Sequence, residues 1–182
     1  IKRLIYRAKK IKLFPRITKS KKQFIQYNYI TGKIFYKLIN ENNFQKLLYF
    51  LNNKLWNNIK KKNIITLCKK FYHKKTLERI DLFLNKYDYK KDSKTNINGV
   101  LVPSINVLMD NIPWQEIYKG IPSKIHGDLQ FDNIIFDKKS FSLIDWREDF
   151  GKNINYGDLY YDLSKMYAGI EMNYDIIKKG KF

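Results

Sequence analysis

Apolar residues recur at helical spacing in two long stretches of the chain. Between residues 42 and 59, and again between residues 66 and 87, they fall three or four positions apart, so each stretch predicts an amphipathic helix with one buried face. Some irregularity is expected around residues 73 to 76. The predicted buried faces are Phe44, Leu47, Leu48, Leu51, Leu55 and Ile59 in the first helix, and Leu67, Phe71, Ile80, Phe83, Leu84 and Tyr87 in the second.

Shorter helices are predicted at three other places. Residues 1 to 12 have helical spacing but no capping residue before them, so we expect the natural N-terminus to lie further upstream. A short helix follows Pro103, with Ser104 as its N-cap, and a longer one begins after Asp158, which also suits an N-cap. The apolar face of this last helix is predicted to be Leu159, Leu163, Met166, Tyr167 and Ile170.

Strand signals are few and short. Residues 23 to 30 are rich in aromatic and β-branched side chains and end at a Thr-Gly turn. Residues 134 to 136 and 141 to 144 are two apolar runs around the polar stretch 137 to 140, which predicts a hairpin. Residues 90 to 99 are polar without periodicity and predict a loop. The expected fold class is therefore α+β and mainly helical.

Four polar residues surround the predicted hairpin. His126 and Asp128 precede it, Asn133 comes directly before its first strand, and Asp145 comes directly after its second strand. Because a hairpin returns the chain to its starting end, Asn133 and Asp145 are expected to lie together. Mg²⁺ prefers oxygen ligands and commonly takes one or two from the protein, so this pair predicts a magnesium site.

Asp128 is the candidate catalytic base. Phosphoryl transfer needs a group that orients the acceptor hydroxyl and takes its proton, and an aspartate five residues before a metal-binding asparagine meets that need. Ordinary turn chemistry is the alternative for each acid alone, but not for the joint pattern. Asp132 and Asp137 are explained by turns or exposure and are left out of the site.

The two motifs H-G-D-x-x-x-x-N and I-D-W resemble those of the aminoglycoside phosphotransferase and choline kinase superfamily, which has a protein kinase-like fold. The stretches 144 to 151 and 156 to 163 are similar to phosphotransferases of bacterial capsule and lipopolysaccharide gene clusters. The resemblance implies that Asp158 and Asp162 brace the catalytic loop without binding metal. His126 is also expected to hold the loop by hydrogen bonds, whereas Trp146 and Arg147 either line the substrate pocket or belong to the core.

The resemblance also implies a division of the chain. Residues 27 to 32 are similar to a kinase hinge, so Tyr29 and Ile30 are the candidate contacts to adenine. Residues 1 to 32 would then be the end of a small lobe with its hinge, and residues 33 to 182 a large catalytic lobe, truncated at both ends. No glycine-rich loop, and no nucleotide-binding Lys with its partner Glu, is visible, so we expect the isolated chain to bind ATP weakly and to turn over poorly.

The charge distribution bears on possible partners. The net charge is +19, but residues 1 to 75 hold 21 Lys or Arg and one acid, whereas residues 126 to 175 hold ten acids. Lys outnumbers Arg 31 to 5, and nucleic-acid sites usually favour Arg, so nucleic-acid binding is the less favoured interpretation. The 44% hydrophobic content excludes a disordered chain. The single Cys68 and the lack of an apolar run long enough to span a bilayer fit a cytoplasmic protein.

Together these patterns predict an ATP- and Mg²⁺-dependent kinase that phosphorylates a hydroxyl of a small molecule, an amino alcohol or a sugar used in surface-polysaccharide synthesis. A non-catalytic kinase-like binding or scaffold protein, or a basic nucleic-acid-binding fragment, remains the alternative. The sequence does not identify the acceptor or the oligomeric state.

Overall fold

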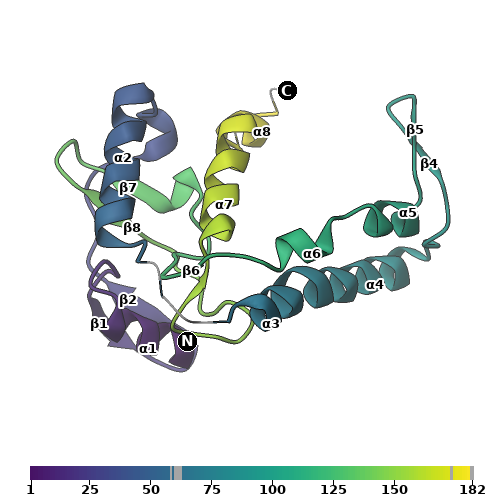
Figure 1. The fold of residues 1–182 in the computed structure, drawn as a ribbon. Helices are drawn as coiled ribbons and strands as arrows, with labels where there is room; N and C mark the ends of the chain where they lie inside the picture. The colour runs from purple at the N-terminus through teal and green to yellow at the C-terminus, as the bar shows by residue number, and fades with distance from the viewer. Residues whose placement is uncertain (58, 60–62, 173, 181–182) are drawn as a thin grey trace. The chain divides into compact units, whose positions relative to one another are not determined.

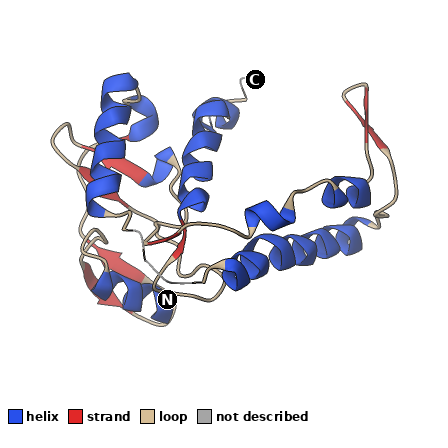
Figure 2. Ribbon diagram, viewed as in Figure 1, coloured by secondary structure: helices blue, strands red, loops and turns tan. Residues whose placement is uncertain are grey.

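The computed structural model describes residues 1–57, 59, 63–172 and 174–180. They form helices and short strands, as Figure 1 and Figure 2 show. Two compact units are present, one made of residues 1–64 and 121–182 (unit 1) and the other of residues 65–120 (unit 2). The predicted division at residue 32 concerns lobes of a larger fold, so it stays a prediction.

Unit 1 contains both ends of the chain and several short strands. Its sheets pair β1 with β2, β3 with β7 and β7 with β8, and β6 with β9, all antiparallel. The elements are α1 (Lys2–Lys10), β1 (Ile17–Ser20), β2 (Ile25–Tyr27), β3 (Lys33–Ile34), η1 (Phe35–Lys37), α2 (Glu41–Lys54), β6 (Pro122–Ser123), η3 (Phe131–Asn133), β7 (Ile134–Phe136), β8 (Phe141–Leu143), β9 (Gly157–Asp158), α7 (Leu159–Glu171) and α8 (Tyr174–Lys178).

The core of unit 1 forms where α2, the β7–β8 hairpin and α7 meet. The predicted face of α2 is correct at Leu47, Leu51 and Leu55, which are almost fully buried. Asn40 caps α2 by accepting a hydrogen bond from the amide N–H of Asn43 at 2.9 Å. The helix ends at Lys54, earlier than predicted, and residue 58 of the predicted helix lies outside the described residues.

The predicted face of α7 is correct at Met166 but wrong at Tyr167 and Ile170. Tyr167 and Ile170 are more than half exposed, whereas Asp162, Met166 and Gly169 are buried. The buried set also has helical spacing, but it contains an acid and a glycine that an apolar pattern does not detect. Gly169 fits because Phe131 and the hydroxyl of Tyr36 lie close to where a Cβ atom would be.

Unit 2 is a helical segment that carries a hairpin. Helical residues run from α3 (Ile65–Cys68) through the π-helical η2 (Lys69–Lys74) to α4 (Lys75–Tyr87), so the predicted irregularity is real but begins a few residues earlier. His73 stacks on Trp114 with ring centroids 4.3 Å apart. The remaining elements are β4 (Thr95–Ile97), β5 (Val100–Val102), α5 (Ile105–Asp110) and α6 (Trp114–Ile117).

Two predictions for unit 2 are wrong. Phe83 and Tyr87 were placed on a buried face, but they are 47% and 60% exposed. The region 90 to 99 was interpreted as a loop, but it contains β4, which pairs with β5. Asn98 and Gly99, both at positive φ, make the two-residue turn between these strands. The prediction of Ser104 as an N-cap is confirmed, because its hydroxyl accepts from the amide of Val107.

Candidate active site

The β7–β8 hairpin brings the two predicted metal ligands to one end. Ile134 faces Leu143 in the register, and just beyond them the N–H of Ile144 donates to the carbonyl oxygen of Asn133 at 3.0 Å. Asp145 is the next residue. At the other end, Asp137 accepts hydrogen bonds from the amides of Ser140 and Lys139, which lower the pKa of its carboxyl. Asp137 is therefore a turn residue.

The side chain of Asn133 is oriented by the candidate catalytic loop, residues 126 to 133. Its Nδ2 atom donates to the carbonyl oxygen of Asp128 at 2.9 Å, so Oδ1 is the atom left for another partner. Asp145 is exposed and has a φ of 55°, in the left-handed region that few residues other than glycine adopt. Such backbone strain recurs at functional sites because the surrounding structure must hold it in place.

Asp128 is partly exposed and has two side-chain partners. Its Oδ1 atom accepts from Nε2 of Gln130 at 3.2 Å and lies 3.1 Å from Nζ of Lys165. Within the described part of the chain both contacts involve the same oxygen, which leaves Oδ2 for an acceptor hydroxyl. The sequence did not indicate Lys165 or Gln130, since neither belongs to the motifs that singled out the site.

His126 joins the candidate catalytic loop to the end of β8. Its ring is fully buried; Nδ1 accepts from the amide of Asp128 at 3.2 Å, and Nε2 donates to the carbonyl oxygen of Ile144 at 2.8 Å. Burial lowers the pKa of His126 to about 4, so the imidazole is neutral near pH 7. One ring thus fixes the residue after Gly127 and the residue before Asp145.

Asp162 holds the same loop from α7. Its carboxylate accepts from the amide of His126 at 2.8 Å, from the amide of Gly127 at 2.8 Å and from the indole N–H of Trp56 at 3.1 Å. Burial raises the pKa of Asp162 to about 6, and the hydrogen bonds partly oppose this rise. These contacts engage both oxygens of Asp162 in supporting the loop.

Asp158 connects the start of α7 to the strand before the catalytic loop. Its Oδ1 atom accepts from the amide of Tyr160 at 3.2 Å as an N-cap, and from the amide of Ile121 at 2.8 Å. The pairing of β6 with β9 reinforces this connection. Asp158 is almost fully buried and does not point to a metal-binding role.

Arg7 is a component that the sequence interpretation missed. It is buried, and its guanidinium donates to the carbonyl oxygen of Ile125 at 2.6 Å and to that of Arg147. Its guanidinium carbon lies 5.9 Å from the ring centroid of Trp146. Burial lowers the pKa of Arg7. The sequence did contain a signal for the burial of Arg7, because this residue shares the helix face of Leu4, Ala8 and Ile11.

Trp146 and Arg147 separate into different environments. Trp146 is buried in the core, where its indole N–H donates to the carbonyl oxygen of Leu143 at 2.8 Å, so the structure favours its core alternative. Arg147 is partly exposed and packs against Gly127, which has a φ of 87° and lies so close that an added Cβ would be 2.7 Å from the Arg147 Cβ. Only glycine suits that position.

The candidate hinge lies between β2 and β3. Tyr29 is 89% exposed, and Ile30 is partly buried. Residues 28 to 30 have no regular structure, so the predicted strand over residues 23 to 30 is shorter than expected. The proposed adenine contact stays a prediction.

The candidate site at Asn133 and Asp145 offers few protein ligands to a magnesium ion. Over the described ranges, no group of three or more His, Cys, Asp or Glu residues forms a metal site. One amide oxygen and one carboxylate nevertheless suit Mg²⁺, which keeps waters and takes substrate phosphate oxygens for the rest of its shell. The pair fits an ion that binds together with a nucleotide, not a tightly held structural ion.

A cavity of about 680 Å³ lies elsewhere in unit 1. It is lined by the outer side of α2 and the turn of the β7–β8 hairpin, including Lys46, Tyr49, Lys139 and Phe141. This turn is at the opposite end of the hairpin from Asn133 and Asp145. None of the predicted site residues lines it, so the cavity is not the candidate active site.

Comparison with known proteins does not identify a family, since no protein-family model, curated protein or solved structure matches the chain. In the described part of the chain, no helix has the length and apolar character needed to cross a membrane.

Proposed function

We propose that this chain carries the phosphotransfer centre of an ATP- and Mg²⁺-dependent small-molecule kinase. One observation supports this most strongly. The β7–β8 hairpin and the ring of His126 bring Asp128, Asn133 and Asp145 to one end of the hairpin, each with a polar atom left for another partner. A base and two oxygen ligands in this arrangement are what transfer to a hydroxyl requires.

In the proposed reaction Asp128 does the protein's part of the chemistry. Its carboxylate orients the acceptor hydroxyl and takes its proton as the oxygen forms a bond to the γ-phosphorus of ATP. The bond from the γ-phosphorus to the bridging oxygen breaks, and ADP leaves. Asn133 Oδ1 and the Asp145 carboxylate would hold Mg²⁺, which when bound neutralises charge on the phosphates. The acceptor is an amino alcohol or a sugar, and the reaction takes place in the cytoplasm.

The test is a phosphorylation screen with the full-length protein. Radiolabelled ATP, Mg²⁺ and a set of amino alcohols, sugars and aminoglycosides are supplied, and the labelled product is measured for wild type, Asp128→Asn and Asp145→Asn. Asp132→Asn is the matched control, because Asp132 lies on the same loop but pairs with Lys178 at 2.6 Å. The proposal expects transfer in wild type and control only. ATP binding without transfer to any acceptor would support the scaffold alternative instead.

A further inference from the structure

The cavity between α2 and the turn of the β7–β8 hairpin is lined by few kinds of side chain. Among the described residues that line it, four are lysines, four are aromatic, three carry a side-chain amide and one is a serine. The lysines are Lys46, Lys54, Lys138 and Lys139, and the aromatic residues are Tyr49, Phe50, Phe136 and Phe141. The volume of about 680 Å³ is in the range of small-molecule sites.

One wall of the cavity is the outer face of α2. Asn42, Lys46, Tyr49 and Asn53 follow one another at intervals of four or three residues and therefore share a face of the helix. The core of unit 1 takes the other face, where Leu47 is buried. Tyr49 is 75% exposed, so its ring is accessible to a ligand in the cavity.

The apolar part of the lining consists of aromatic rings. Phe136 and Phe141 stack with centroids 4.3 Å apart, and the ring of Phe50 lies 5.4 Å from that of Phe141. Phe136 is buried, whereas Phe50 and Phe141 are partly exposed beside Tyr49. Aromatic surfaces of this kind favour a flat ring, which can stack on them or meet them edge to face.

The amides suit a ligand with a polar edge. Asn53 donates through Nδ2 to the carbonyl oxygen of Tyr49 at 2.7 Å, and Gln45 donates through Nε2 to Glu41 at 3.3 Å. Within the described residues, these bonds leave the amide oxygens of Asn53 and Gln45 for another partner. An amide offers both a donor and an acceptor, as the edges of nucleobases require. A purely aliphatic ligand would leave these groups unused.

The charge of the lining is positive after the nearby acids are counted. Over the described ranges, none of the four lysines of the cavity forms a salt bridge. The acids in α2 and in the hairpin turn are Glu41 and Asp137, so the lysines still exceed them by two charges. Asp137 also accepts the amides of Lys139 and Ser140. Asp145 lies at the opposite end of the hairpin. A phosphate group would therefore be attracted to this cavity.

We propose that this cavity binds a nucleoside phosphate. The base stacks on Tyr49 above the phenylalanine rings, the amides of α2 bind its polar edge, and the lysines of α2 and of the hairpin turn hold the phosphate. This site is separate from the proposed phosphotransfer centre, since the turn is at the opposite end of the hairpin from Asn133 and Asp145. The inference does not depend on the proposed kinase activity.

The test measures binding of the four ribonucleoside monophosphates to the full-length protein without Mg²⁺, by calorimetry. The comparison probes are the matching nucleosides, ribose 5-phosphate and inorganic phosphate. We expect at least one monophosphate to bind more tightly than its nucleoside and than ribose 5-phosphate, because only the complete nucleotide meets the rings and the lysines together. In NMR spectra, that nucleotide should shift the side-chain amide signals of Asn42, Gln45 and Asn53.

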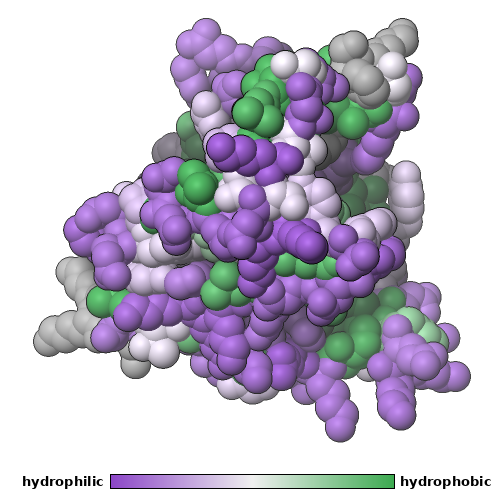
Figure 3. Space-filling model, turned by 90° about the vertical axis from the view of Figure 1, so that its right-hand side faces the viewer, coloured by the Kyte–Doolittle hydropathy of each residue, from purple (hydrophilic) through white to green (hydrophobic). Residues whose placement is uncertain are grey.

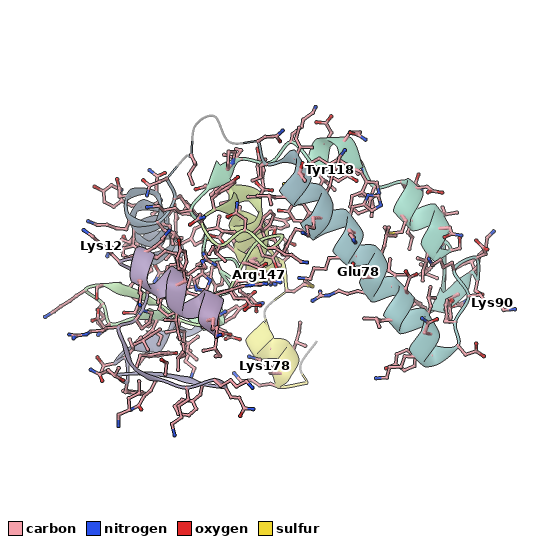
Figure 4. The ribbon with its side chains drawn as sticks, turned by 90° about the horizontal axis from the view of Figure 1, so that it is seen from below. Lys12, Glu78, Lys90, Tyr118, Arg147 and Lys178 are labelled. Atoms are coloured by element: carbon pink, nitrogen blue, oxygen red, sulfur yellow. The ribbon has the colours of Figure 1, made fainter. Side chains whose placement is uncertain are left out.

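Variants separate the ring from the phosphate. Tyr49→Ala should weaken binding of the nucleotide about five- to a hundred-fold, the value of one stacked base, and Tyr49→Phe should retain it. Replacing Lys138 and Lys139 together by Met should weaken it about four- to twenty-fold, since one exposed ion pair is worth about two- to fivefold. Lys12→Met is the matched control, because Lys12 is an exposed lysine of unit 1 outside the cavity (Figure 4), and it should leave the affinity unchanged.

Three results would overturn the proposal. The first is the absence of binding by all four monophosphates, or binding that survives both Tyr49→Ala and the double lysine variant. The second is ribose 5-phosphate that binds as tightly as the nucleotides, because the lysines would then attract phosphate alone. The third is a single-stranded oligonucleotide that binds far more tightly than any monophosphate and depends on Tyr49, which would make nucleic acid the ligand. A circular dichroism melt shows that each variant is folded.

Discussion

Two groups of residues in unit 1 differ in burial and in how fully their polar atoms are used. His126, Asp162 and Arg7 are buried, and the side-chain hydrogen bonds that they make are to the candidate catalytic loop and to the chain around it. Asp128 and Asn133 are partly exposed and Asp145 is exposed. The difference indicates that the buried group, which we call the support, serves stability and geometry, and it leads us to expect that the exposed group serves the proposed chemistry. Substitutions should therefore separate the two properties.

The largest effect is expected in the support, at Asp162. Asp162→Ala leaves the amides of His126 and Gly127 and the indole of Trp56 without their acceptor, at a cost of roughly 3–5 kcal/mol in the free energy of unfolding. Asp162→Asn keeps one acceptor oxygen and should lose less. Urea unfolding measures both variants, and a change below about 1 kcal/mol for Asp162→Ala would show that the support is not needed.

Substitutions in the exposed group should lower activity and leave stability almost unchanged. Asp128→Asn removes the proton acceptor, and general bases typically contribute about 10²- to 10⁴-fold to the rate. We expect kcat for phosphoryl transfer to fall by that factor with the melting temperature almost unchanged. A large fall in melting temperature would place Asp128 in the support and remove the contrast between the groups.

Arg7 and Arg3 lie on the same helix, α1, so they allow the stability contributions of a buried and an exposed arginine to be compared. Arg7→Met leaves the carbonyl oxygens of Ile125 and Arg147 without their donor and should cost about 1–3 kcal/mol. Arg3→Met removes an exposed ion pair with Asp149 and should cost less than about 1 kcal/mol. Thermal unfolding compares them. Equal losses would mean that the burial of Arg7 contributes nothing specific.

A further effect is the pH dependence of stability that His126 confers. Its folded pKa is about 4, below the ordinary value of 6.5, so the unfolded state binds its proton more readily between these values. Its contribution to stability is present above pH 6.5 and is lost as pH falls toward 4. Asp162, with its pKa raised to about 6, acts in the opposite direction over part of this range.

Comparison with a variant isolates the histidine, because the contribution of Asp162 is common to both proteins. The stability difference between wild type and His126→Gln should shrink as the pH falls from 7 to 4. A difference that stays constant over this range would mean that the buried imidazole is not neutral in the native state.

The sequence predicted the local elements of the site better than the parts that surround it. The hairpin, with Asn133 and Asp145 at one end, follows from two apolar runs and a turn, and the structure confirms that arrangement. The sequence also contained a strong signal for the second hairpin, because Asn-Gly is a common two-residue hairpin turn. The strands on either side of Asn98 and Gly99 were not recognised, because they are short and lie next to a polar stretch.

Contacts between distant segments could not be predicted in this way. Lys165 meets Asp128 across 37 positions, and Arg7 meets Ile125 across 118. Periodicity identifies which side of a helix is buried, but it does not say which buried polar group finds which partner. The exposed Phe83 and Tyr87 show the converse, since an apolar stripe does not guarantee a partner surface. Hydrophilic side chains cover most of the face in Figure 3.

The most direct test of the central claim is transfer of the γ-phosphate of labelled ATP by the full-length protein in the presence of Mg²⁺, compared among wild type, Asp145→Asn and Asp132→Asn. The account predicts labelled product from wild type and from Asp132→Asn, and a loss of at least about a hundred-fold in Asp145→Asn with unchanged thermal stability. Equal transfer by Asp145→Asn and wild type would contradict it.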